Sequence, residues 1–109
     1  MEKRLGKIEK VHFGLGGYHD AMIGYSFTLS GEGWGVCTQW KGFWIQDYNP
    51  NSKWEHQDRL NTLGQTILDL GQTLLAAKKT DIKQLVGVPI EATFDGNVLH
   101  DWRILTEVL

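Results

Sequence analysis

Large apolar residues at every second position predict two strands near the start of the chain. They alternate with polar or small residues from Lys7 to Leu15, and the same period recurs from Ile23 to Leu29. A period of two places alternate side chains on one face, so both segments are expected to be half-buried strands. The glycine-rich segment GLGGYHD separates them and is interpreted as a loop, with a ligand-binding loop as the alternative.

A third strand is predicted after a short glycine turn. Trp34, Val36, Thr38 and Trp40 share the next period-two face, and Gly31–Gly33 provides the turn that joins this segment to the strand before it. The three strands together predict an antiparallel meander. The following segment alternates poorly, and its NPNS sequence is typical of a loop in which Ser52 or a neighbour caps the next helix.

A long amphipathic helix is predicted from Trp54 to about Lys79. Apolar residues and glycines recur at spacings of three and four and form one broad face, made of Leu60, Leu63, Gly64, Ile67, Leu68, Leu70, Gly71, Leu74 and Leu75. We expect this face to lie against the sheet, with the opposite, polar face in water. Gly64 and Gly71 then allow close approach to the sheet or to a neighbouring helix, or else form a self-association seam.

The last third of the chain predicts a short helix and a hairpin. TDIKQLVG carries a capping Thr80 or Asp81 and a terminal glycine. Asp95-Gly96 is a strong hairpin signal, with one face formed by Ile90, Ala92 and Phe94 before it and another by Val98, His100, Trp102 and Ile104 after it. The predicted fold is α+β: an antiparallel β-meander, one long and one short helix, and a C-terminal β-hairpin (βββ-αα-ββ).

Composition narrows the classes of function. The 109 residues suit a single domain, residues 1–109, and the formal net charge of −2 argues against general binding to nucleic acid. A single cysteine excludes an intramolecular disulfide, and no segment has the apolar length of a signal peptide or a membrane span. These features predict a cytoplasmic protein that does not associate with membranes.

Recognisable catalytic and metal-binding patterns are not found in the sequence. The glycine-rich segment precedes a strand, whereas dinucleotide and phosphate loops open a helix. The four histidines are scattered without the spacing of a metal site, and the carboxylates near the helix start are explained by the helix dipole. The expectation is therefore a protein that is not an enzyme and uses no cofactor and no metal.

The remaining chemical signal is a surplus of aromatic residues accompanied by arginines and an amide. Five tryptophans are many for a chain of this length. Such residues can stack on a nucleobase, bond its edge and pair with phosphates, although they can equally fill the core of a small sheet. The candidate ligand-binding residues are Tyr18, Trp40, Arg59, Asn97 and Arg103.

Three blocks of sequence carry a resemblance to known proteins. GLGGYHDAMIGYSFTLSGEGWGV, DRLNTLG and FDGNVLHDWRILTEVL resemble those of small uncharacterised proteins encoded by phages and prophages. In size, β-rich start, central helices and terminal strand pair, the chain is also similar to phage Thoeris anti-defence proteins, which sequester cyclic ADP-ribose isomers.

This resemblance implies a non-catalytic sponge in the host cytoplasm. Such a protein binds a host immune signalling nucleotide without cleaving it, often in a pocket shared between subunits, which implies a homo-oligomer. The alternative is a protein-binding inhibitor or accessory factor that acts on a host or phage protein through an aromatic surface.

Overall fold

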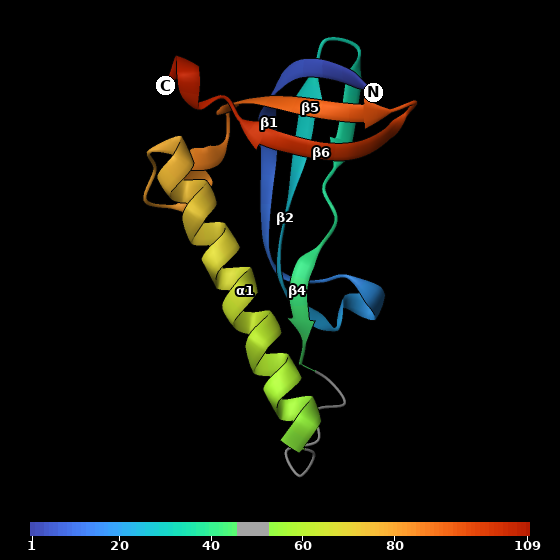
Figure 1. The fold of residues 1–109 in the computed structure, drawn as a ribbon, viewed down its shortest axis with the longest axis vertical. Helices are drawn as coiled ribbons and strands as arrows, with labels where there is room; N and C mark the ends of the chain where they lie inside the picture. The colour runs from blue at the N-terminus through green and yellow to red at the C-terminus, as the bar shows by residue number, and fades with distance from the viewer. Residues whose placement is uncertain (46–52) are drawn as a thin grey trace.

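The computed structural model describes residues 1–45 and 53–109, with the side chains of residues 53–56 outside the description. The predicted NPNS loop and its capping Ser52 therefore lie outside the described residues. The fold is α+β, as predicted (Figure 1). Its elements are strands β1 (Glu2–Gly16), β2 (Met22–Gly31), β3 (Trp34–Cys37), β4 (Lys41–Trp44), β5 (Pro89–Asp95) and β6 (Val98–Ile104), helix α1 (Lys53–Ala77), and the short 3₁₀-helices η1 (Tyr18–Asp20), η2 (Ile82–Leu85) and η3 (Thr106–Val108).

The strands form an antiparallel sheet in the order β3-β2-β1-β5-β6, with β4 also pairing with β2. The predicted β1-β2-β3 meander and the C-terminal hairpin are confirmed. In each hairpin a glycine adopts the positive φ that the turn requires, 76° at Gly33 and 62° at Gly96. β3 and β4 share β2 as their partner: β3 pairs with residues 28–31 and β4 with residues 22–25.

Two predicted elements are wrong. TDIKQLVG forms not an α-helix but the single 3₁₀ turn η2, and α1 is the one α-helix in the described part of the chain. The expected capping is present, because Asp81 accepts from the amide of Lys83 and Gln84 bonds back to the Asp81 amide. The turn ends at Leu85 because the next residue, Val86, is extended (φ −61°, ψ 126°), and Gly87 follows with φ 90°. The strand predicted through Trp40 ends at Cys37, and a separate strand, β4, follows.

Two bulges change which side chains face inward. In β1 the register shifts between Ile8 and Lys10, so Ile8 and Val11 both face the core although they are three residues apart. In the β5–β6 hairpin a register shift between Thr93 and Phe94 exchanges the inward-facing and outward-facing positions at the start of β6. The prediction for β6 was therefore wrong in part: Val98 and His100 are exposed. Trp102 and Ile104 face inward as expected, together with Leu99.

The core lies between one face of the sheet and the C-terminal half of α1. The predicted inward faces of β2 and β5 are confirmed, and their central side chains are almost completely buried. The core cluster consists of Ile8, Tyr25, Phe27, Leu29, Ala77, Leu85, Val88, Ile90, Ala92, Phe94 and Ile104.

The second half of β1 has an open edge. β5 pairs with β1 as far as Lys7, and Ile8 still bonds the backbone of Gly87 and Val88. Beyond Ile8, β2 is the one described strand that pairs with β1. On the β3 side, the amide of Phe27 donates to the hydroxyl oxygen of Thr38, and the carbonyl of Phe27 accepts from the amide of Thr38. Its partner Val11 therefore directs its own amide and carbonyl away from β2, and the alternation of an antiparallel ladder gives Phe13 and Leu15 the same orientation.

The long helix is confirmed, but the expectation that its apolar face lies against the sheet is wrong for most of its length. The polar Thr66 is 7% exposed, Asp69 pairs with Lys41 of β4 at 3.5 Å, and Arg59 donates to the carbonyl of Trp44. Only the apolar residues nearest the C-terminal end reach the core, namely Leu70, Leu74, Ala76 and Ala77.

The two helix glycines do not mediate close approach within the chain. A Cβ on Gly64 or Gly71 would meet no atom within 4 Å, so the expected contact with the sheet is absent. No described helix combines the length and the hydropathy required to cross a bilayer.

Candidate functional site

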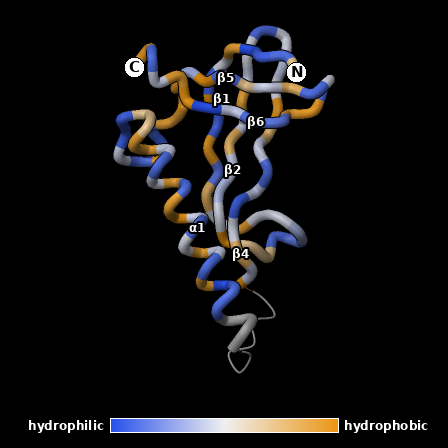
Figure 2. Tube along the Cα trace, viewed as in Figure 1, coloured by the Kyte–Doolittle hydropathy of each residue, from blue (hydrophilic) through white to orange (hydrophobic). Residues whose placement is uncertain are grey.

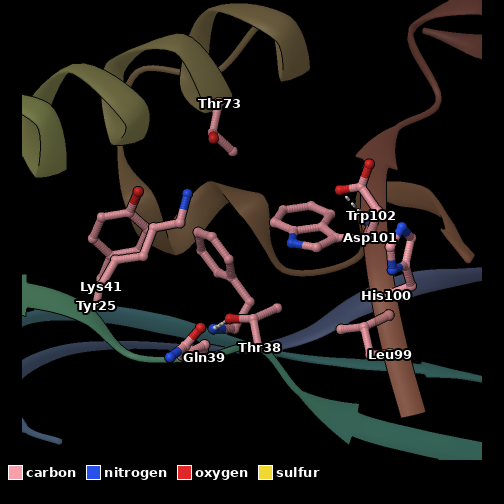
Figure 3. Close-up of a pocket in the computed structure, with 10 residues that line it drawn as sticks. Tyr25, Thr38, Gln39, Lys41, Thr73, Leu99, His100, Asp101 and Trp102 are labelled. Atoms are coloured by element: carbon pink, nitrogen blue, oxygen red, sulfur yellow. Dashed lines mark hydrogen bonds between the residues drawn. The ribbon is translucent and has the colours of Figure 1, made fainter. Parts of the chain in front are cut away.

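A partly enclosed hollow lies between α1, β6 and the segment that leads into β4. It has a volume of about 240 Å³, and a second hollow of about 390 Å³ adjoins it. Both share Lys41, Thr73, Asp101 and Trp102, so we treat them as one groove, the α1–β6 groove. Figure 3 shows the first hollow, whose lining residues are Tyr25, Phe27, Thr38, Gln39, Lys41, Thr73, Leu99, His100, Asp101 and Trp102.

Aromatic side chains form the apolar part of the groove. Trp102 reaches inward from β6 and meets Phe27 of β2 edge to face, with ring centroids 5.5 Å apart. Phe27 in turn lies 5.5 Å from Tyr25, its neighbour on the same face of β2. Asp101 accepts a hydrogen bond from the amide of Trp102 at 2.8 Å, which orients its carboxylate beside the indole (Figure 3). The result is a preformed aromatic wall with polar groups at its margin.

Polar groups from two elements face one another across the groove. Figure 3 shows Lys41 directed toward the helix, where it pairs with Asp69 at 3.5 Å. Burial, and secondarily the charge of Asp69, raises the pKa of Tyr25 to about 12. The Tyr25 hydroxyl is therefore protonated at neutral pH and can donate a hydrogen bond. Thr73 and Gln39 add a hydroxyl and an amide from opposite sides.

Arg103 lines the second hollow but is held by two carboxylates. Its guanidinium forms a two-bond fork with Glu107 at 3.0 and 2.9 Å and bonds Glu91 at 3.2 Å. These bonds raise the pKa of Arg103 further, and the guanidinium lowers the pKa of Glu107 to about 2. The fork ties η3 to β6 at one end of the groove.

The five sequence-predicted residues do not converge on one site. Arg103 lines the α1–β6 groove, and Asn97 lies exposed in the turn between β5 and β6. Arg59 lines a different hollow of about 310 Å³ beside Trp44, to whose carbonyl it donates. Tyr18 meets Trp44 edge to face at 6.1 Å, and Trp40 lines a shallow hollow near β4. Arg59 and Arg103 therefore do not share a pocket.

The structure explains two of the three glycines of GLGGYHD, Gly16 and Gly17, by packing, whereas a Cβ on Gly14 would meet no atom within 4 Å. A Cβ on Gly16 would lie 2.8 Å from two ring carbons of Trp40, and one on Gly17 would lie 3.2 Å from the same indole. Trp40 also covers Gly42, and its Nε1 is buried without a hydrogen-bond partner among the described residues. Gly16 and Gly17 thus provide a flat surface for an indole ring.

Within the described residues, no three histidine, cysteine or acidic side chains lie close enough to hold a metal ion. Comparison of the chain with family models, with curated proteins and with solved structures gives no match in any of the three.

Sequence reasoning missed most of the groove. Trp102 was placed correctly on an inward strand face but not recognised as a groove wall, and Lys41, Asp69 and Thr73 were not considered. One signal was present: Asp69 and Thr73 lie one turn apart on α1, so their side chains share a face. Their meeting with Lys41 depends on which face of α1 turns toward the sheet, and the hydrophobic pattern indicated the opposite face.

Proposed function

We propose that this protein binds a small nucleotide in the α1–β6 groove and holds it without cleaving it. The observation that carries the proposal is the juxtaposition of an inward-facing indole, Trp102, with the ammonium of Lys41 in a preformed hollow. An indole can stack on a base, and an ammonium can pair with a phosphate. The volumes of the two adjoining hollows suit a ligand of mononucleotide size.

Retention without reaction is supported by the groups that line the groove. Tyr25 is protonated at neutral pH, which makes it a hydrogen-bond donor and not a base. Lys41 is engaged with Asp69, and a phosphate could compete for the same ammonium. The resemblance to phage proteins supplies the biological setting of the proposal: a counter-defence sponge that lowers the concentration of a host immune signalling nucleotide, such as a cyclic nucleotide, in the host cytoplasm.

Uptake followed by release tests binding and turnover together. The purified protein is incubated with cyclic nucleotides, including cyclic ADP-ribose isomers, and separated from them by filtration. The bound fraction is then heated, and both fractions are examined by mass spectrometry. We expect depletion of one nucleotide from the filtrate and its intact recovery after heating. A chemically altered product would overturn the proposal in favour of an enzyme.

Matched variants test where the nucleotide binds. Trp102→Leu and Lys41→Gln should each weaken uptake at least about tenfold, because each removes a stacking or charge-assisted contact. Trp44→Leu and Lys83→Gln make the same chemical changes outside the groove and should leave uptake unchanged. Arg59→Gln separates the groove from the pocket expected from the sequence, since Arg59 lines a different hollow. Loss of uptake in Arg59→Gln alone would move the site to β4.

A protein-binding inhibitor remains the second candidate, favoured by one surface. Tyr18 is 69% exposed and meets the partly exposed Trp44 edge to face, and Ile45 follows in the chain. Exposed aromatic residues of this kind act as anchors in protein interfaces. If the protein acts in this way, it takes up no nucleotide, and Tyr18→Ala abolishes its inhibition of the partner protein.

A further inference from the structure

One part of the apolar face of α1 does not pack on the core. We call this part the stripe; it consists of Leu60, Gly64, Ile67, Leu68, Gly71 and Leu75. The exposed fractions are 47% for Leu60, 53% for Ile67, 53% for Leu68 and 79% for Leu75. Gly64 and Gly71 lie in the same stripe, with open space where a Cβ would be. Figure 2 shows hydrophobic residues recurring along α1 on either side of hydrophilic ones. An exposed apolar face of this extent on a surface helix marks an interaction surface.

The stripe is symmetric about its own midpoint. Leu60 and Leu75 are equidistant from the peptide bond that joins Ile67 to Leu68, and so are Gly64 and Gly71. A second helix running antiparallel about a two-fold axis through that bond would place Leu60 opposite Leu75, Gly64 opposite Gly71, and Ile67 opposite Leu68. A two-fold interface requires this self-complementarity, whereas a surface for an unrelated partner does not.

We propose that this stripe is a homodimer interface in which two copies of α1 pack antiparallel. The glycines lie opposite each other and allow close approach of the two backbones, while the larger residues fill the space above and below them. The stripe carries no ionisable side chain between Leu60 and Leu75, so no charge becomes buried on association. Antiparallel pairing also places the dipoles of the two helices side by side in opposite directions, which is electrostatically favourable.

Two residues of β1 expose further apolar area. Phe13 and Leu15 lie on the sheet face that α1 covers only in part, next to Val11 along β1, and they are 56% and 60% exposed. Each exposed side chain offers on the order of 100 Å². The four large stripe residues and these two together offer on the order of 600 Å², against the roughly 800 Å² per partner that a stable dimer buries.

The interface and the α1–β6 groove use different sides of the same helix. Asp69 and Thr73 line the groove, whereas Ile67, Leu68 and Leu75 point away from it. The dimer therefore does not depend on the proposed nucleotide. Disruption of the dimer and loss of nucleotide uptake are separable measurements.

Sedimentation equilibrium with two matched variants tests the dimer. The unmodified protein is expected to be dimeric. Leu68→Lys keeps a good helix former but places two ammonium groups near the two-fold axis, and it should weaken the dimer at least about a hundredfold. Leu5→Lys makes the same change at an exposed leucine of β1 and should leave the dimer intact. A monomeric wild-type protein, or a dimer that tolerates Leu68→Lys, would overturn the proposal, whatever other protein the stripe then binds.

Cross-linking tests the antiparallel register and does not depend on the stability of the lysine variant. In a Cys37→Ser background, which removes the exposed native thiol, Leu60→Cys and Leu75→Cys are prepared separately and mixed. Antiparallel pairing predicts a disulfide between the two variants and none within either alone, because residues 60 and 75 lie roughly 22 Å apart along the helix. A disulfide formed by Leu60→Cys alone would indicate parallel helices and overturn the register.

Discussion

The indole of Trp40 lies on the backbone of Gly16, so that a Cβ at Gly16 would come within 2.8 Å of two ring carbons. Trp34 has the same relationship with Gly6, where the corresponding distance is 2.7 Å. Each tryptophan thus fills the space above a strand glycine that has no side chain. Part of the tryptophan surplus is therefore explained by packing and not by ligand binding.

Gly16→Ala should destabilise the protein by about 1–3 kcal/mol, because the added methyl must displace the Trp40 indole from a packed position. Urea denaturation followed by tryptophan fluorescence measures the free energy of unfolding. Gly35→Ala is the control, since a Cβ there meets only the carbonyl oxygen of Leu29 at an ordinary 3.8 Å. Equal destabilisation of the two variants would contradict the packing account.

Tyr25 should make stability fall at high pH. Its folded pKa of about 12 exceeds the value of about 10 in the unfolded chain, so the unfolded state loses its proton first as pH rises. The free energy of unfolding should therefore decline between pH 10 and pH 12. Denaturation midpoints across that range measure the decline, and Tyr25→Phe should remove this contribution. An unchanged slope in Tyr25→Phe would assign the loss to other groups.

The Arg103–Glu107 fork should loosen in acid. The pKa of Glu107 is about 2 when folded, below its ordinary value of 4.5, so the unfolded state binds the proton first as pH falls. The contribution of the fork is therefore complete above about pH 4.5 and is lost as pH approaches 2. Because the pair is exposed, the clearest measurement is an NMR titration of the Glu107 carboxyl carbon. Arg103→Gln should raise the titration midpoint toward 4.5, whereas Arg4→Gln should not change it.

Replacing either helix glycine should have opposite effects on folding and on dimerisation. In the monomeric Leu68→Lys background, Gly64→Ala and Gly71→Ala should each stabilise the protein by about 0.5–1 kcal/mol, because alanine favours the helix and nothing obstructs its methyl. Thermal unfolding measures this gain. In the otherwise native chain the same methyls should separate the paired helices and raise the dimer dissociation constant. Stabilisation of the monomer without weakening of the dimer would place the glycines outside the homodimer interface.

The sequence was most informative where local chemistry decides structure. Alternation in β2 and β5, the glycine turn at Gly33 and the Asp95-Gly96 hairpin were all predicted correctly, because each depends on neighbouring residues alone. The bulges after Ile8 and Thr93 were not predicted, since a bulge is defined by the partner strand. The failure with α1 has the same origin. An apolar stripe indicates that a helix face is covered, but it does not say whether the sheet or a second molecule covers it.

The residues of the candidate site come together only in the folded chain. Lys41 and Asp69 are ordinary charged residues of a strand and a helix, and their pairing depends on the polar face of α1 turning toward β4. Arg59 and Arg103 were grouped by chemical type, yet they lie in different hollows. The residue types indicated which chemical groups could bind a nucleotide. Which of these groups lie close together is determined by the fold.

The open edge of β1 has a consequence for handling the protein. Beyond Ile8 this edge of the strand has no partner among the described strands, and the apolar Val11, Phe13 and Leu15 lie along it, an arrangement that can recruit strands from other molecules into fibrils. Gly14 and Gly16 interrupt this segment and reduce its β propensity, and Lys10 adds a charge near its start. Aggregation during concentrated storage should therefore begin at residues 11–15, and Phe13→Lys should delay it.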